Sequence, residues 1–323
     1  MLGAHWETIA KHTTHLILFS LEISKNGDIT ALDRFPRSAL YKEARTSTRQ
    51  HGCQLLVCFG GNGRSSGFSA MTRSKRARTA FLINLKQFIQ KHELDGVDYN
   101  WEYPGYQFGR GYLSDEEVEL DYEGLLALLK ETRALLGDDA SITMSYYPDG
   151  RQESILVQKE ATKYVNLFHA MAYDNRGQHS TMQHFEVATK QAISTFNVHK
   201  SKVTIGLPFY GRSVKNGDWK SYEDIVQQQS LTTKMNQVGD QYFNGVDLIR
   251  KKVRHALDHR VGGVMIWEVG QDCRVVEKKT GSDVHVVTCP ERKMSLLLAI
   301  TDELKMNDAP DSVAGVGEST NDL

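Results

Sequence analysis

Three polar residues at alternate positions of one short segment have the types and spacing that acid–base chemistry needs. Asp98, Asn100 and Glu102 are separated by Tyr99 and Trp101. Successive side chains of an extended strand point to opposite faces, so the three polar side chains would share one face. Burying them costs several kcal/mol unless they are paired or used. We expect Glu102, at the carboxyl end of the strand, to be a catalytic carboxyl; a satisfied buried polar ladder is the alternative.

The elements that would position this segment are predicted from the recurrence of short apolar runs. Such runs predict strands at residues 16–19, 55–57, 96–101, 142–144, 165–168, 203–205 and 264–267. Longer amphipathic segments between them predict helices at residues 81–92, 125–136, 187–196 and 246–259. Ser114 and Glu117 have the spacing of a capping box before the second of these helices. Regular alternation of strand and helix predicts an α/β fold with a parallel sheet.

The number of strands favours one barrel over two smaller domains. Seven predicted strands are one short of a (β/α)8 TIM barrel, and residues 5–12, which precede the first of them, have the pattern of a loop and a short helix. We therefore expect an N-terminally truncated barrel over residues 1–304 that lacks its first strand; a barrel open at one edge is the alternative. Residues 305–323 become rich in Gly, Ser and Thr and predict a disordered tail.

Composition limits the classes of partner. The 323 residues are 40% hydrophobic and 24% charged, with a formal net charge of −1, so no long-range field would gather nucleic acid or an anionic membrane. The basic run at residues 73–78 leads into a predicted helix and is interpreted as its solvated end. The apolar runs are all shorter than the ~18 residues of a membrane span. We expect a monomer with no nucleic-acid or membrane partner.

Four cysteines fall into two neighbourhoods. Cys53 and Cys58 are five residues apart on one predicted strand, point to opposite faces and are expected to be free thiols. Cys273 and Cys289 flank a hairpin pattern with Thr280-Gly281 at its centre, which a disulfide could close. Such a bond would indicate an oxidising compartment. Neither pair has metal-ligand spacing, and we expect neither a metal nor a cofactor.

The segment 95–102 resembles the family-18 glycoside hydrolases, the chitinase-like barrels. Their pattern Asp-Gly-x-Asp-x-Asp-x-Glu is matched except that Asn100 replaces the third Asp. Four further segments are similar to motifs of that family in the same order: Cys58-Phe59-Gly60-Gly61, Met171-Ala172-Tyr173-Asp174, residues 206–212 and residues 263–267. The resemblance covers most of the chain. Alignment with the family implies that the strand missing from this sequence is the family's first strand, which carries an aromatic residue.

The resemblance implies retaining hydrolysis of chitin in which the 2-acetamido group of the substrate is the nucleophile. Glu102 would be the acid and base, with its pKa raised by burial and by the charge of Asp98. The family's third Asp orients the acetamide and offsets its charge; Asn100 could bond the amide but supplies no charge. The family motif that matches residues 58–61 is Ser-x-Gly-Gly, and Cys58 replaces its Ser, so the residues around Asp98 differ from the family as a set.

The resemblance also implies a substrate site. The hydroxyl of Tyr173 would hold the acetamide carbonyl, Asp174 a sugar hydroxyl or the acetamide, and Trp267 would be the apolar floor beneath a sugar ring. Tyr210 and Arg212 could bond further hydroxyls. Met171, Gly60 and Gly61 belong to the same motifs and are expected to line the site. For Trp267 alone, a core tryptophan is an equally good interpretation.

Several alternatives remain open. A glycan-binding lectin on the same fold is one, although such proteins usually lose the acid that Glu102 preserves, and an endo-β-N-acetylglucosaminidase acting on N-glycans is another. A dinucleotide loop at residues 61–67 is disfavoured because its glycine spacing is wrong. About thirty residues separate Arg212 from the helix at Val246, which predicts a shallow groove and internal cuts in N-acetylglucosamine polymers. The resemblance implies a secretory or extracellular location, while residues 1–11 lack signal-peptide character.

Overall fold

The centre of the molecule is a curled sheet with the strand order β14-β9-β8-β7-β4-β3-β1-β2. The structure is a computed structural model that describes residues 5–228, 230–280, 283–285 and 287–308. The strands of this sheet are β1 (His15–Ile23), β2 (Ile29–Thr30), β3 (Gln54–Gly60), β4 (Gly96–Asn100), β7 (Ser141–Tyr146), β8 (Leu167–Ala170), β9 (Val203–Pro208) and β14 (Gly263–Trp267). All neighbours pair in parallel except β2, which pairs antiparallel with β1.

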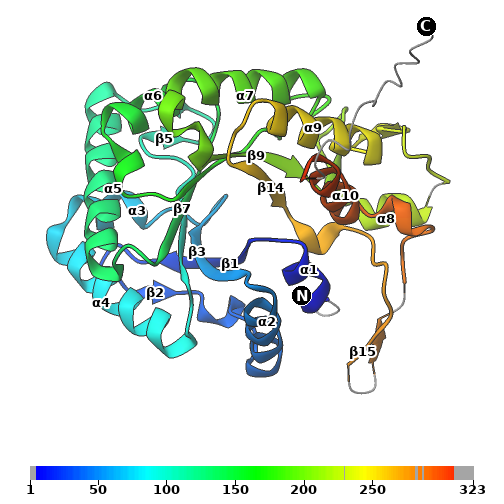
Figure 1. Cartoon of the computed structure of the whole chain (residues 1–323). Coiled ribbons are helices and arrows are strands. Elements are labelled where there is room, and N and C mark those ends of the chain that lie inside the picture. Colours follow the sequence, from blue (N-terminus) through cyan, green and yellow to red (C-terminus); the bar gives the residue numbers. More distant parts are fainter. Residues whose placement is uncertain (1–4, 229, 281–282, 286, 309–323) are drawn as a thin grey trace, which may run out of the picture.

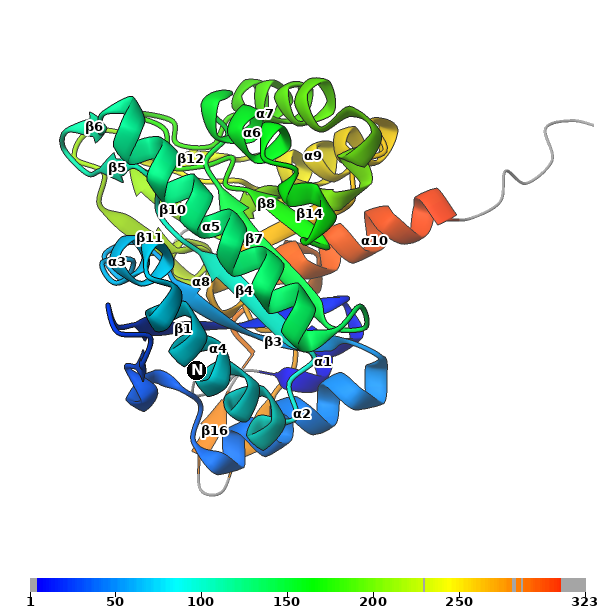
Figure 2. The ribbon, with the colours of Figure 1, turned by 90° about the vertical axis from the view of Figure 1, so that its left-hand side faces the viewer.

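Helices cover the outside of the sheet, as the two views in Figures 1 and 2 show. They are α1 (Trp6–Lys11), α2 (Ser38–His51), α3 (Phe68–Arg73), α4 (Lys75–His92), α5 (Asp115–Leu136), α6 (Arg151–Gln158), α7 (Met182–Phe196), α8 (Tyr222–Gln228), α9 (Val246–Asp258) and α10 (Leu296–Asp308). Short 3₁₀ helices lie at Leu32–Arg34, Ala161–Lys163, Asn197–Lys202, Val269–Gln271 and Arg292–Met294. No described helix has the length and apolar character needed to span a membrane.

The expected α/β barrel architecture is confirmed. The seven parallel strands that the described residues contain correspond one for one to the seven predicted runs, although β8 begins two residues later than expected. The first helix turn of α5 is capped as predicted, because the Ser114 side chain accepts a hydrogen bond from the Glu117 backbone N–H at 3.3 Å. Acidic side chains in that first turn also complement the helix dipole.

The sheet is open between its two outer parallel strands. Within the described residues no backbone hydrogen bond joins β1 to β14, and β14 pairs with β9 alone. Each side chain of β14 is only partly buried, whereas all five residues of β4, in the middle of the sheet, are buried. At their carboxyl ends the two outer strands still meet through an edge-to-face contact of Phe19 and Trp267, with ring centroids 4.4 Å apart. A strand could be added at this opening.

Shorter elements surround the carboxyl ends of the sheet. A four-stranded antiparallel sheet consists of β10 (Tyr210–Ser213), β11 (Trp219–Ser221), β12 (Gln237–Val238) and β13 (Gln241–Tyr242). Two hairpins pair β5 (Tyr106–Gln107) with β6 (Gly111–Tyr112), and β15 (Lys278–Thr280) with β16 (Asp283–His285). Only a hairpin between the two cysteines was predicted, and its strands lie at Lys278–Thr280 and Asp283–His285, closer to the turn than the apolar residues 274–276 that suggested it. The other strands, of two to four residues, leave too short a pattern to detect.

The predicted disulfide between Cys273 and Cys289 is present, with the two Cα atoms 4.8 Å apart, and it closes the base of the β15–β16 hairpin. This hairpin extends away from the body in Figure 1. Gly281, at the centre of the predicted turn, lies outside the described residues. Cys53 and Cys58 are buried free thiols, as expected. Helix α10 continues to Asp308, four residues into the segment expected to be a tail; residues 309–323 lie outside the described residues.

Candidate active site

Strand β4 presents its two faces as the alternation predicted. Tyr99 points toward the helices, where its hydroxyl is 2.8 Å from Thr132 Oγ1 of α5, and Trp101 stacks on Phe68 of α3 with ring centroids 5.2 Å apart. On the other face, Asp98, Asn100 and Glu102 all line a cavity of about 1250 Å³ at the carboxyl ends of the strands. The cavity continues toward α1 and α10 because the sheet is open between β1 and β14.

Asn100 and Glu102 are hydrogen-bonded to each other. Asn100 Nδ2 donates to Glu102 Oε1 at 3.1 Å, and the buried Oδ1 of Asn100 has no hydrogen-bond partner among the described residues. The backbone of Glu102 is fixed by Ser65, whose hydroxyl accepts from the Glu102 N–H at 3.1 Å. An unpartnered buried acceptor costs free energy and is a place where a ligand N–H would bind favourably.

The Glu102 carboxyl is suited to proton transfer near neutral pH. Its pKa is raised to about 7: burial is the largest cause, the hydrogen bond from Asn100 lowers the pKa, and the charge of Asp174 raises it. We had expected the like charge to come from Asp98; the structure gives that role to Asp174. A carboxyl with a pKa near the working pH can both donate and accept a proton.

Asp98 is buried beneath Asn100 and Glu102. Its Oδ1 accepts a hydrogen bond from Thr143 Oγ1 at 2.6 Å and lies 3.9 Å from His169 Nε2. Burial is the largest effect on His169 and lowers its pKa, so the imidazole is neutral at neutral pH. Cys58 lies opposite Asp98 in the β3–β4 register, and burial raises the pKa of its thiol, which is therefore protonated.

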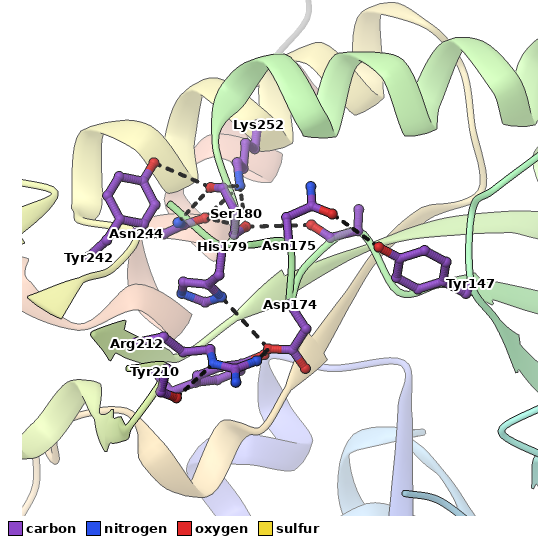
Figure 3. A network of polar contacts seen from close by, with 12 residues as sticks. Tyr147, Asp174, Asn175, His179, Ser180, Tyr210, Arg212, Tyr242, Asn244 and Lys252 are labelled. Atoms are coloured by element: carbon purple, nitrogen blue, oxygen red, sulfur yellow. Dashed lines mark hydrogen bonds and ion pairs between the residues drawn. The ribbon is translucent and has the colours of Figure 1, made fainter. Parts of the chain in front are cut away.

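Asp174 lies across the cavity on the segment that follows β8. Its Oδ1 accepts hydrogen bonds from Tyr210 Oη and from Arg212 Nη1, both at 2.8 Å, and the contacts are drawn in Figure 3. Half of the Asp174 side chain is exposed to the cavity. Both donors bind Oδ1, and no hydrogen bond to Oδ2 is formed within the part of the chain that the structure describes. Oδ2 is therefore available to a hydroxyl or amide of a ligand.

Tyr173, Met171 and Trp267 complete the predicted lining. The hydroxyl of Tyr173 is 4.0 Å from Met265 Sδ, a weak acceptor, so it keeps its capacity to bond a ligand. Met171 is buried and lines the cavity wall. Trp267 is only partly buried at the end of β14 and lines the cavity, which favours the binding interpretation over a core tryptophan.

Gly60 and Gly61 have a different place. Neither lines the cavity. A Cβ on Gly60 would lie 2.4 Å from the Asn100 carbonyl oxygen, and one on Gly61 would lie 2.4 Å from the ring of Phe19. Both also have positive φ values, 101° and 105°. The geometry gives them a packing function at the end of β3 and offers no support for the predicted substrate contact.

Several cavity residues were missed from the sequence: Tyr103, Tyr147, Arg64 and Trp219. Tyr103 and Tyr147 lie two and three residues past the ends of predicted strands, so their position past a carboxyl end was a usable signal. Trp219, with 63% of its surface exposed, lies on β11 opposite Arg212, and nothing in its neighbourhood predicted a place at the cavity. In the described part of the chain, no group of three or more His, Cys, Asp or Glu side chains is placed to hold a metal ion.

Comparisons with known proteins agree with this fold. The family model described as "Glycosyl hydrolases family 18" matches residues 4–272. "Probable chitinase 2" of Drosophila melanogaster is 23% identical over 306 residues, which cover 74% of this chain but only 61% of that relative.

Among solved structures, a chitinase from Bacteroides thetaiotaomicron superposes with a TM-score of 0.76 at 18% identity, covering 97% of this chain and 94% of that one. A mutant of Ostrinia furnacalis Group II chitinase catalytic domain 2, in complex with penta-N-acetylchitooctaose, has a TM-score of 0.72 at 18% identity and coverages of 94% and 91%. At these identities the structural likeness establishes the fold.

Proposed function

The chain belongs to family 18 of the glycosyl hydrolases, and on this premise we propose that it hydrolyses β-1,4-linked N-acetylglucosamine polymers, with Glu102 as acid and base. The observation that carries the proposal is the Glu102 carboxyl, with a pKa of about 7, in a cavity of about 1250 Å³. One acid–base carboxyl is enough when the acetamide of the substrate is the nucleophile. The oligosaccharide bound by the Ostrinia furnacalis mutant is of the same chemical class.

The proposed reaction has two steps. In the first, protonated Glu102 gives its proton to the glycosidic oxygen while the acetamide oxygen attacks the anomeric carbon, so the leaving sugar departs as an alcohol and an oxazolinium ion remains. In the second, ionised Glu102 takes a proton from water, whose oxygen attacks the anomeric carbon and reopens the ring. Two inversions at that carbon give net retention.

Asn100, Tyr173 and Asp174 would hold the acetamide during these steps. The unpartnered Oδ1 of Asn100 can accept from the acetamide N–H, and the Tyr173 hydroxyl can donate to the acetamide oxygen. Asn100 carries no charge, so it gives the oxazolinium ion less stabilisation than a carboxylate would. Losing one such electrostatic contact costs about 10²–10³ in rate.

Asn100 also supports a second candidate function, a lectin on this fold that binds N-acetylglucosamine oligosaccharides and turns them over slowly or not at all. Cys58 beside Asp98 is a second departure from the family pattern in the same place. Hydrolysis of N-glycan cores by an endo-β-N-acetylglucosaminidase would use the same acetamide chemistry. Trp267, Tyr210 and the chitinase-like motif at residues 206–212 favour a linear polymer.

We further propose that the enzyme cuts internally and acts in an oxidising compartment. The segment between β10 and α9 contributes only short strands and α8 beside the cavity, which supports an open groove. The Cys273–Cys289 disulfide supports a secretory or extracellular location.

The test of the proposed function is digestion of soluble chitin oligomers and of an N-glycan in parallel, with products separated over time. Mixed oligomers from the earliest times are expected from the chitin series, and no cleavage of the N-glycan. Early products dominated by the dimer would exclude internal cutting. Binding without hydrolysis would establish the lectin instead.

A further inference from the structure

Lys252 of α9 is a fully buried amine, which the proposed chemistry does not use. Its Nζ donates to three oxygens: Ser180 O at 2.9 Å, Ser180 Oγ at 2.8 Å and Asn244 Oδ1 at 2.6 Å. An ammonium group has three donors, so its hydrogen bonds are satisfied, yet all three acceptors are uncharged. Burial lowers the pKa of Lys252 well below its ordinary value. A buried amine without a carboxylate is costly and needs a reason.

The oxygens that Lys252 binds belong to the end of the segment that begins at Asp174. Ser180 O also accepts from Asn244 Nδ2 at 2.9 Å and from Tyr242 Oη at 3.4 Å, so four hydrogen bonds from three side chains converge on Ser180. Nearer the cavity, Asn175 N–H donates to His179 O at 3.1 Å and closes the segment on itself. Figure 3 shows Lys252 at one end of this network and Asp174 at the other.

His179 connects the two ends. Its imidazole is fully buried, with its centroid 5.0 Å from that of Tyr210 and its Nδ1 3.9 Å from Asp174 Oδ1. Burial lowers the pKa of His179 to about 4; Asp174 opposes this, and the charges of Lys252 and Arg212 reinforce it. The ring is therefore neutral at pH 5–8, a packed support between Tyr210 and Asp174 that does not form an ion pair.

We propose that Lys252 is a positioning residue that fixes residues 174–180 through Ser180 and Asn244 and thereby holds the Asp174 carboxylate toward Glu102 and the substrate. A backbone segment without a regular ladder needs such contacts to keep one conformation. Asp174 has a positive φ of 66°, a conformation that a non-glycine residue keeps only where its surroundings enforce it. The effect of Lys252 on substrate turnover rests on the proposed function. The effect of Lys252 on the conformation of residues 174–180 does not.

The first test needs no substrate and uses hydrogen exchange with mass spectrometry on the full chain. Lys252→Met keeps the length of the side chain and removes the amine, and Lys251→Met, at the exposed neighbouring position of the same helix, is the matched control. We expect exchange of residues 175–181 to be about tenfold faster in Lys252→Met, with β3 and β4 unchanged and the control like wild type. Unchanged exchange of the segment, or equal acceleration throughout the chain, would overturn the proposal.

A second variant covers the case in which Lys252→Met does not fold. Ser180→Ala removes one of the three acceptors of Lys252 and leaves the backbone carbonyl, so its exchange effect should be smaller but confined to the same residues. Ser180→Ala with wild-type exchange in that segment would contradict the proposal.

The second test measures coupling to the site. Lys252→Met should lower kcat/KM on a chitin oligomer about tenfold in the wild type. In a variant that already carries Asp174→Asn, the same change should lower kcat/KM less than about twofold, because substitutions of residues that act through one another do not have additive effects. Equal losses in the two backgrounds would mean that Lys252 acts on stability alone. If the wild type itself does not cleave chitin, the proposed function fails, while the exchange experiment still decides the role of Lys252.

Discussion

Asn100 donates a hydrogen bond to the carboxyl oxygen Oε1 of Glu102 across 3.1 Å, and the amide oxygen of the same Asn100 is buried with no hydrogen-bond partner among the described residues. The amide therefore has one atom committed to the proposed acid and one that a ligand could use. The bond favours the ionised form of Glu102 and opposes the burial that raises its pKa. Asn100 thus influences both the protonation of the acid and the fit of the acetamide.

Changing Asn100 to Asp should raise activity. The carboxylate would offset the charge of the oxazolinium ion, for which we expect an increase in kcat of about 10²–10³. It would also replace a donor by a like charge beside Glu102, so the pKa of Glu102 and the alkaline limit of activity should rise.

The control for this change is Gln271→Glu, which adds the same charge elsewhere in the cavity. Steady-state rates on a chitin oligomer across pH 4–9 compare the two. Equal effects of both variants would refute the special position of Asn100.

The pH dependence of the wild type should report Glu102. Its pKa is about 7, so the proton that it must donate is present below pH 7 and is lost as pH rises through that value. We expect kcat/KM to fall about tenfold per pH unit above pH 7. Asp174→Asn should move this limb to lower pH, because Asp174 raises the pKa of Glu102. A limb near pH 5 in the wild type would contradict the assignment.

Removing the disulfide should destabilise the protein. Cys273 and Cys289 are separated by 16 residues, a loop for which the chain-entropy estimate is about 3 kcal/mol. Thermal unfolding of the variant with both residues changed to Ser should occur at a lower temperature than for the wild type. A reductant should lower the midpoint of the wild type but not that of the variant, since Cys53 and Cys58 are free. A midpoint insensitive to both changes would show that the bond does not stabilise the fold.

The opening between β1 and β14 should be visible in amide exchange. Strand β14 pairs on one side only, whereas β9 pairs on both. Peptides covering residues 263–267 should exchange at least about tenfold faster than those covering residues 203–208. Equal protection of the two strands would contradict the opening. We propose that an eighth parallel strand belongs there.

The seven parallel strands of the sheet were predictable because each contains a short apolar run, whereas the two-residue strand β2 was not predicted. The face of β4 was predictable for the same reason, since alternation alone places Asn100 beside Glu102. Trp219 and Ser65 were not, because they enter the site from loops and from a three-residue strand whose placement depends on tertiary packing. The like charge that acts on Glu102 was assigned to Asp98, the neighbour in sequence, but comes from Asp174, which only the curvature of the sheet brings near.

Glycines and buried amines show a second limit of prediction from the sequence. The motif grouped Gly60 and Gly61 with the binding residues. Their packing function depends instead on the Asn100 carbonyl and the Phe19 ring, which come from other strands. Lys252 has no local signal at all, because an amphipathic helix pattern places a lysine on the solvated face. Its burial depends on acceptors from Ser180 and Asn244, one of them more than seventy residues away.

The most direct test of the central claim is the rate of chitin-oligomer hydrolysis by the wild type and by Glu102→Gln. Glu153→Gln is the control, since Glu153 is also buried, also has a pKa raised to about 7 by burial, and lies outside the cavity. If Glu102 is the acid and base, Glu102→Gln should lose about 10²–10⁴ in kcat while still binding the oligomer, and Glu153→Gln should remain active. A Glu102→Gln variant as fast as the wild type would contradict the account.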